Sequence, residues 1–492
     1  MSKPSLVSNY IYNLSYQILI LITPLITAPY VSRVLGSEGI GKYSYAQSIV
    51  TYFILFGTVG TNIYGQREIA YAQSDLQKRS NKFFEIIILR FITLSLSILL
   101  YISIFINKSQ DVIIYKILLI EIISCIFDIT WFFQGLEEFK KIVLRNTAIK
   151  FVSIVLIFLL VKNADDLPMY TLCSTLPILL GNISLWVYLP KYLLRPNKIK
   201  LNNHILSIIS LFIPQIATEV YTVLDKIMLG SMSSNIAEVG FYTQSQRLIK
   251  MSLCVVTSLG TIMLSRMSHA FFEKNHEVIK NSIYNSFKFV FFIGSPIMIG
   301  IAGISINFVP WFFGDGFEKV SILMIITSPI ILLIGMSNVI GRQYLLPTNQ
   351  DKKFTKSVIV GASVNVVLNF IMIPSIGSVG AVISTLISET CVTVTQIIFI
   401  RKELKISEVL KQTNSYIIIS LIMGIVVYLL GNALPPSIIT TMVQIIVGII
   451  IYTLGLIVTK DEILRLFKDI LLKKYNDKKC IKELDINEKK VN

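Results

Sequence analysis

Apolar stretches of about 20 residues, separated by short polar breaks, follow one another from residue 11 to residue 458. A helix of that length spans the roughly 30 Å hydrocarbon core of a bilayer. Only helices and closed barrels satisfy all of their backbone hydrogen bonds inside that core. The pattern therefore predicts an all-α integral membrane protein. The fourteen predicted spans are 11–31, 43–64, 83–106, 112–133, 147–161, 167–189, 205–229, 241–264, 287–308, 320–340, 358–373, 379–400, 416–434 and 438–458.

The composition agrees with this class. Of the 492 residues, 53% are hydrophobic and only 15% are charged. The mean hydropathy is +0.69, a value typical of membrane proteins. The polar breaks stay short until the C-terminal tail, so the sequence predicts no separate soluble domain. Any functional chemistry is therefore expected among the helices.

The net charge of +16 reflects membrane topology rather than nucleic-acid binding. Lysine and arginine are concentrated in alternate loops and in the tail after Thr459, whereas the opposite loops carry few of them. Cytoplasmic loops of membrane proteins are enriched in these two residues. The distribution predicts that both termini are cytoplasmic, and no nucleic-acid partner is expected.

Two segments of the chain resemble each other. Residues 24–48 contain PLIT, LG and GKYSYAQS, and residues 214–245 contain PQIA, LG and GFYTQS at similar spacing. The offset corresponds to six predicted helices, so both copies would enter the membrane in the same direction, as in a two-lobed transporter with parallel repeats. A chance likeness of two hydrophobic hairpins is the alternative. The predicted organisation is an N-terminal lobe (1–200), a C-terminal lobe (201–411), two further helices (412–459) and a basic tail, amphipathic and then disordered, on the cytoplasmic side (460–492).

The sequence contains no convincing catalytic or nucleotide-binding motif. Residues 36–42 match part of a phosphate-binding loop, but Tyr43 stands where Ser or Thr must reach a magnesium ion. His204, His269 and His276 fall in predicted cytoplasmic loops, where solvated side chains are expected, and no metal-ligand spacing is present. We therefore expect no enzyme, cofactor, metal site or nucleotide partner. A proton or sodium gradient, or the substrate gradient, would supply the energy.

Charged residues within spans are the strongest functional signal, because each costs about 2.5–3.5 kcal/mol at bilayer depth and must face a polar interior. Lysine and especially arginine bind phosphate oxygens, and amides near span ends can bind sugar hydroxyls. The candidate substrate-binding residues are Arg33, Arg90, Lys226, Arg247, Lys250, Gln47 and Gln246. The candidate ion-coupling residues are Asp128, Glu219, Asp225 and Glu389. Structural ion pairs and hydrogen bonds between helices are the alternative for all of these residues.

Three stretches near the N-terminus carry a family resemblance: PLITAPYVSRVLG (24–36), GKYSYA (41–46) and YGQREIA (64–70). They resemble the signature of Wzx-type polysaccharide flippases, in the multidrug/oligosaccharidyl-lipid/polysaccharide exporter superfamily. The resemblance implies two six-helix lobes in a V-shaped arrangement plus two extra C-terminal helices. It also implies that the cationic cavity residues of the family correspond to Arg33, Arg90, Arg247 and Lys250 here.

The function implied by the resemblance is transport of an undecaprenyl-pyrophosphate-linked oligosaccharide repeat unit. The unit would move from the inner to the outer leaflet of a bacterial plasma membrane by ion-coupled alternating access, for capsule, O-antigen or exopolysaccharide assembly. Membrane lipids and a polysaccharide polymerase are candidate partners. A multidrug/cation antiporter of the same superfamily, or a lipid II-type flippase, are the alternatives. A membrane polymerase or ligase is disfavoured because no large outer loop is predicted.

Overall fold

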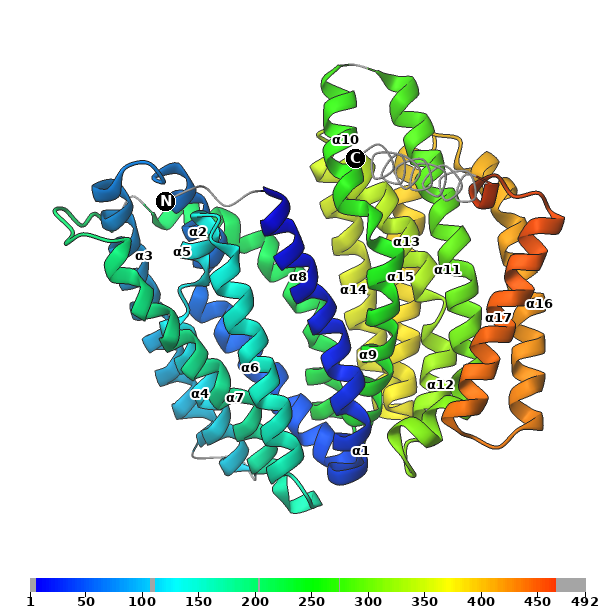
Figure 1. Ribbon diagram of the computed structural model, residues 1–492, viewed down its shortest axis with the longest axis horizontal. Coiled ribbons are helices and arrows are strands. Elements are labelled where there is room, and N and C mark those ends of the chain that lie inside the picture. Colours follow the sequence, from blue (N-terminus) through cyan, green and yellow to red (C-terminus); the bar gives the residue numbers. More distant parts are fainter. Residues whose placement is uncertain (1–5, 107–110, 202–203, 274, 466–492) are drawn as a thin grey trace, which may run out of the picture. The chain divides into compact units, whose positions relative to one another are not determined.

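A computed structural model describes residues 6–106, 111–201, 204–273 and 275–465, and every regular element in these ranges is helical (Figure 1). The first seven helices are α1 (Leu6–Thr58), α2 (Thr61–Tyr71), α3 (Leu76–Tyr101), α4 (Val112–Phe127), α5 (Thr130–Gly135), α6 (Phe139–Leu160) and α7 (Leu167–Ser184). The short helices between them are η1 (Ile102–Ile106), η2 (Ala164–Asp166) and η3 (Leu185–Lys191).

The second part of the chain is also helical. Its elements are α8 (Ile205–Met232), α9 (Ala237–Thr257), α10 (Leu259–Phe272), α11 (His276–Phe313), α12 (Glu318–Thr327), α13 (Ile330–Ile340), η4 (Gly341–Leu345), α14 (Asp351–Ile376), α15 (Ser378–Ile400), α16 (Ile406–Ala433) and α17 (Ile438–Val458). Within the described ranges, nine helices are long and apolar enough to cross a bilayer. The expectation of an all-helical, multi-span membrane protein is therefore confirmed, and the count of fourteen spans stays a prediction.

The first predicted span and most of the second lie in one helix, α1, which kinks between them. The kink is at Gly36, whose φ of 65° and ψ of 179° are not helical. Glycine adopts a positive φ without the steric cost that a Cβ would bring. The polar segment predicted as a loop between the two spans is thus helical on either side of a single glycine. The helix ends at Thr58, because Val59 and Gly60 have φ values of 47° and 74°.

Two other predicted spans are broken by polar residues. The span 112–133 divides into α4 and α5 at Asp128, which leaves the helical region with ψ of 106°. The Asp128 carboxylate accepts hydrogen bonds from the backbone N–H of Thr130 at 3.0 Å and from its hydroxyl at 2.7 Å. The span 241–264 divides into α9 and α10 at Ser258. Such local side-chain hydrogen bonds compete with the helical pattern.

The chain forms two compact units, each described here on its own. Unit 1 comprises residues up to Arg247 together with 312–323 and 365–384, and unit 2 comprises 248–311, 324–364 and the residues from 385 onward. The predicted lobe boundaries at residues 200 and 411 stay a prediction. The described residues of the predicted tail include Ile463 and Leu464, which pack against the hydrophobic core of unit 2. Residues 466–492 of the tail lie outside the described residues.

An aromatic core fills unit 1 near its loops, and one histidine belongs to this core. Phe83 stacks on Trp131, with ring centroids 5.6 Å apart. His204 is fully buried, accepts or donates a hydrogen bond at the Tyr64 hydroxyl, and contacts Glu85 Oε2 at 2.8 Å. The prediction of a solvated loop side chain was therefore wrong for His204. Its imidazole is buried because it satisfies two buried polar groups from α2 and α3.

Candidate functional site

Polar side chains of α1, α4 and α7 meet inside unit 1. The amide nitrogen of Gln47 donates to both carboxylate oxygens of Glu121, each at 2.9 Å. Tyr43 lies one helical turn before Gln47 and packs edge-on against Tyr170, with ring centroids 4.9 Å apart and ring planes at 73°. The Ser174 hydroxyl is hydrogen-bonded to the two phenol groups. The spacing of four residues on α1 and on α7 places each pair on one helix face.

Two cations complete this group. The guanidinium of Arg247, near the middle of α9, interacts electrostatically with the phenols of Tyr43 and Tyr170. The ammonium of Lys150 on α6 interacts with the Glu121 carboxylate. We call this group the polar cluster; it consists of Tyr43, Gln47, Glu121, Lys150, Tyr170, Ser174 and Arg247. Gln47 and Arg247, which were both predicted to contact substrate, belong to this cluster.

The sequence reasoning missed part of this cluster. Lys150 lies within the predicted span 147–161, so a full count of charges in that span would have found it. Tyr43 and Tyr170 gave no signal, because tyrosine is common near span ends as a membrane anchor. The assembled cluster offers hydroxyl, amide, carboxylate and guanidinium groups beside two aromatic rings. Such groups can bind sugar hydroxyls and phosphate oxygens.

Arg90 makes its hydrogen bonds with partners outside this cluster. Its side chain is 1% exposed. The guanidinium donates to the carbonyl of Cys125 at 2.8 Å, to the amide oxygen of Asn62, and to Asp128 Oδ2 at 3.5 Å. The sequence left open whether Arg90 and Asp128 serve substrate and ion binding or pair with each other. In this conformation they form an ion pair between α3 and the break after α4.

Asp225 lies at a second buried polar site in unit 1. It is 4% exposed and accepts hydrogen bonds from the Tyr242 hydroxyl at 2.6 Å and from Asn369 Nδ2 at 2.7 Å. The same Asn369 nitrogen also donates to Asn365 at 3.2 Å, and Asn369 Oδ1 is buried without a hydrogen-bond partner among the described residues. A buried carboxylate beside further oxygen atoms can take up a proton or a hard cation such as sodium.

The other candidate substrate-binding residues differ in their exposure to solvent and in their neighbours. Arg33 is exposed, and its side chain runs beside Gly314, where an added Cβ would lie 2.9 Å from Arg33 Cγ. Lys226 is half-buried on α8, and Lys250 is exposed on α9. The Gln246 amide nitrogen is buried without a hydrogen-bond partner in the part of the chain that the structure describes.

The last two acidic candidates lie on α8 and α15. Glu389 is 7% exposed and belongs to unit 2. Glu219 lies on α8, but its side chain is outside the described residues. No group of three or more potential metal ligands (His, Cys, Asp or Glu) occurs among the residues searched, which are the described ones.

The two copies of the repeat pack against each other within unit 1. An added Cβ at Gly240 would lie 2.1 Å from the Ser37 carbonyl oxygen, and one at Gly41 would lie 2.1 Å from the Ile236 carbonyl oxygen. Next to this contact, Gln244 donates to the Ser32 hydroxyl at 2.8 Å. Only glycine permits so close an approach of two backbones. The repeated G-x-Y pattern, at residues 41–43 and 240–242, thus marks a helix crossing between the two copies.

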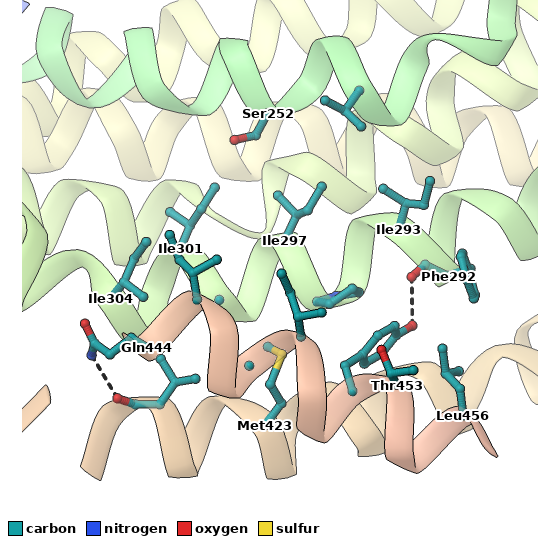
Figure 2. Close-up of a pocket in the computed structure, with 18 of the residues that line it drawn as sticks. Ser252, Phe292, Ile293, Ile297, Ile301, Ile304, Met423, Gln444, Thr453 and Leu456 are labelled. Carbon is teal, nitrogen blue, oxygen red and sulfur yellow. Dashed lines mark hydrogen bonds between the residues drawn. The ribbon is translucent and has the colours of Figure 1, made fainter. Parts of the chain in front are cut away.

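Unit 2 contains an apolar pocket of about 600 Å³ between α9, α11, α16 and α17. Figure 2 shows Ile293, Ile297 and Ile301 of α11 on one side of this pocket and Met423 of α16 on the other. Two of its polar side chains are hydrogen-bonded to backbone carbonyls: the Tyr452 hydroxyl donates to Phe292 at 2.7 Å, and Gln444 Nε2 donates to Val427 at 2.9 Å. The pocket therefore suits an apolar chain better than a sugar.

Comparison with known sequences identifies the family. Residues 6–271 match the family described as "Polysaccharide biosynthesis protein". The chain belongs to this family. The resemblance drawn from residues 24–70 is thereby confirmed. The "Putative O-antigen transporter" of Escherichia coli (strain K12) is 26% identical over 418 residues, which cover 81% of this chain and 98% of that protein.

Further comparisons find a second curated relative and two solved structures of similar fold. The lipid II flippase MurJ of Bacillus subtilis (strain 168) is 22% identical over 187 residues, 37% of this chain and 34% of that protein. A solved structure of lipid II flippase MurJ in an inward closed conformation has a TM-score of 0.72 at 18% identity, covering 93% of this chain and 100% of that one. An inward-facing multidrug resistance transporter of the MATE family has a TM-score of 0.59 at 13% identity, covering 82% of this chain and 99% of that one. These two structures establish a shared fold.

Proposed function

We propose that the protein flips undecaprenyl-pyrophosphate-linked oligosaccharide repeat units from the inner to the outer leaflet of a bacterial plasma membrane. The product serves capsule, O-antigen or exopolysaccharide assembly, with a polysaccharide polymerase as a candidate partner. The observation that carries this proposal is the similarity over 98% of the length of the Escherichia coli protein named as an O-antigen transporter. The polar cluster supports it, since it combines phosphate-binding and hydroxyl-binding groups among membrane helices.

The proposed mechanism is alternating access. Fourteen spans form two six-helix lobes (1–200 and 201–411) in a V-shaped arrangement, followed by two helices (412–459), with both termini in the cytoplasm. The parallel repeat and the charge distribution of the loops support this organisation.

In the substrate complex, Arg247 binds the pyrophosphate, and Gln47 and Glu121 meet sugar hydroxyls. Arg247 has the fixed fork of donors that suits two phosphate oxygens. Gln47 and Glu121 already hydrogen-bond each other at 2.9 Å, so a sugar hydroxyl inserted between them gains both a donor and an acceptor. Arg33, Lys226, Lys250 and Gln246 are further candidates for contacts along the path.

Asp225 is the proposed coupling site for a proton or sodium ion. Its burial and the unpartnered oxygen of Asn369 support this role. Glu219 and Glu389 are the other candidates, and Asp128 is the weakest because it already pairs with Arg90.

The prenyl tail of the substrate stays in the bilayer and trails through a gap between helices, because it is apolar along its whole length.

The test is translocation of a fluorescent undecaprenyl-pyrophosphate-linked oligosaccharide in proteoliposomes, with and without a proton or sodium gradient. Loss of one charge-assisted contact of about 1.5–3 kcal/mol predicts a roughly 10- to 100-fold lower rate for Arg247→Ala. Arg247→Lys keeps the positive charge but loses the paired donors of the planar guanidinium, so an intermediate transfer rate is expected. Arg401→Ala removes an exposed arginine from a loop of unit 2 and serves as the matched control.

The outcomes separate the candidate functions. The flippase is supported if transfer by the wild-type protein depends on a gradient and falls in Arg247→Ala. The coupling site is supported if transfer by Asp225→Asn no longer depends on the gradient. Transfer of lipid II but not of the oligosaccharide would favour the lipid II-type alternative. Extrusion of cationic dyes without lipid transfer would instead favour the antiporter.

A further inference from the structure

A second pocket, of about 940 Å³, lies on unit 1 between α6, α7 and η3. The helices α6 and α7 pack side by side (Figure 1), and η3 follows directly on α7. The pocket is separate from the polar cluster, because none of the cluster residues lines it. Gly181 forms part of its floor: an added Cβ there would lie 2.0 Å from Ile149 Cδ1. Its volume is at the upper end of what well-formed ligand sites offer.

Cations occupy one end of this groove. Lys140, Lys141 and Arg145 line it, and no acidic side chain is among its lining residues in the described chain. Lys140 is exposed, and Arg145 is half-buried and donates to the Asn182 amide oxygen. The three cations precede the predicted span 147–161, so they lie where an apolar helix leaves the membrane.

Aromatic rings hold one of these cations in place. The Lys141 ammonium lies 4.3 Å from the ring centroid of Tyr192 and 5.4 Å from that of Tyr188. It also pairs with Glu138 Oε2 at 3.3 Å, so Lys141 is partly neutralised within the protein. Cation–π contacts and the ion pair preorganise this end of the groove. Lys140 and Arg145 then supply most of the positive charge that faces a ligand.

The rest of the groove is apolar and open to the surroundings of unit 1. Leu144 and Val152, two turns apart on α6, are 56% and 46% exposed, and Leu180 and Val187 are 58% and 77% exposed. In a membrane protein, such surfaces face lipid chains. A row of exposed apolar side chains that begins at a cation cluster therefore matches the shape of a phospholipid, with the headgroup at the helix end and the chains along the groove.

We propose that this groove binds a diacyl phospholipid with an anionic headgroup, such as phosphatidylglycerol. The phosphate contacts Lys140 and Arg145, and the acyl chains lie along Leu144, Val152 and Leu180. The bound lipid seals the α6–α7 surface and fixes the first turns of α6, the helix that also carries Lys150 of the polar cluster. The pyrophosphate of the transported lipid has similar chemistry. The bilayer lipid is favoured because the groove is lined by exposed side chains and by none of the polar cluster.

The experiment is titration of the full-length protein in detergent with lipids, read by native mass spectrometry and by thermal unfolding. The lipids are phosphatidylglycerol, phosphatidylethanolamine with the same chains, and undecaprenyl pyrophosphate. The variants are the single substitution Lys140→Gln and the double substitution Lys140→Gln/Arg145→Gln. The control is the double substitution Lys402→Gln/Lys411→Gln, because both of these lysines are exposed in unit 2. Lys140→Gln changes one exposed side chain and keeps the assay interpretable if the double variant unfolds.

The expected result is saturable binding of phosphatidylglycerol that raises the Tm of the wild-type protein. Binding should weaken about fivefold on losing Lys140 and about 25-fold on losing both cations, with little change in the control pair. Equal binding of phosphatidylethanolamine, or equal loss in the control pair, would overturn the proposal. The contrary result is that undecaprenyl pyrophosphate displaces phosphatidylglycerol at equal or lower concentration and binds less well to Lys140→Gln. That result would assign the groove to the substrate.

Discussion

Replacing Arg90 with alanine should destabilise unit 1 rather than act on substrate binding. The guanidinium donates to the Cys125 carbonyl at 2.8 Å, to Asn62, and to Asp128 at 3.5 Å. A hydrogen bond from a charged donor contributes about 1.5–3 kcal/mol, and the contact with Asp128, at 3.5 Å, is the longest and weakest of the three. Asp128 keeps its two hydrogen bonds from Thr130. We therefore expect the free energy of unfolding to fall by about 4 kcal/mol.

The assay is thermal unfolding of the purified protein, alongside translocation by the fraction that remains folded. At roughly 2–4 °C per kcal/mol, Arg90→Ala should lower the Tm by about 10 °C. Asp128→Asn should lower the Tm less than Arg90→Ala does, since it keeps the side-chain volume and the other two hydrogen bonds of Arg90 and weakens only the longest contact, at 3.5 Å. Folded Arg90→Ala protein should still transport. An unchanged Tm together with lost transport would refute this reasoning and return Arg90 to the substrate site.

Two further predictions concern contacts within unit 1. Gly240→Ala should lower the Tm, at a cost of about 1–3 kcal/mol, because its Cβ would lie 2.1 Å from the Ser37 carbonyl oxygen. Gly300→Ala, whose Cβ would meet its nearest atom at 3.8 Å, is the control, and equal shifts would contradict the close-contact argument. Glu238 precedes the predicted span 241–264. Burial alone would raise the pKa of its carboxyl group, but hydrogen bonds from Lys319 and Ser378 outweigh burial, so the pKa is lowered. A lowered carboxyl pKa means that this stabilisation is complete above the unfolded value of about 4.3 and is lost as pH falls below it. The Tm difference between wild type and Glu238→Gln should therefore shrink between pH 5 and pH 3, as measured by thermal scans; a constant difference would exclude this origin.

Helix positions were largely predictable because membrane insertion depends on local composition. A run of apolar residues must be helical in a bilayer whatever its neighbours are, and helices cover most of each predicted span. The interruptions were not predictable in the same way. The break at Asp128 depends on a hydrogen bond to Thr130 and on the nearby Arg90, and the α1 kink is confined to Gly36. Hydropathy averages over such single residues.

Sequence alone determined that this is a multi-span helical membrane protein, that it resembles polysaccharide flippases, and that charged residues inside spans are the functional candidates. Only the tertiary structure decided which of those residues meet. Gln47 and Glu121 are 74 positions apart, and Arg90 and Asp128 are 38 apart. His204 reads as a loop residue and is buried between Tyr64 and Glu85. The cost of a charge in a membrane is set locally, so the sequence reveals it, whereas the partner that offsets the cost is set by helix packing.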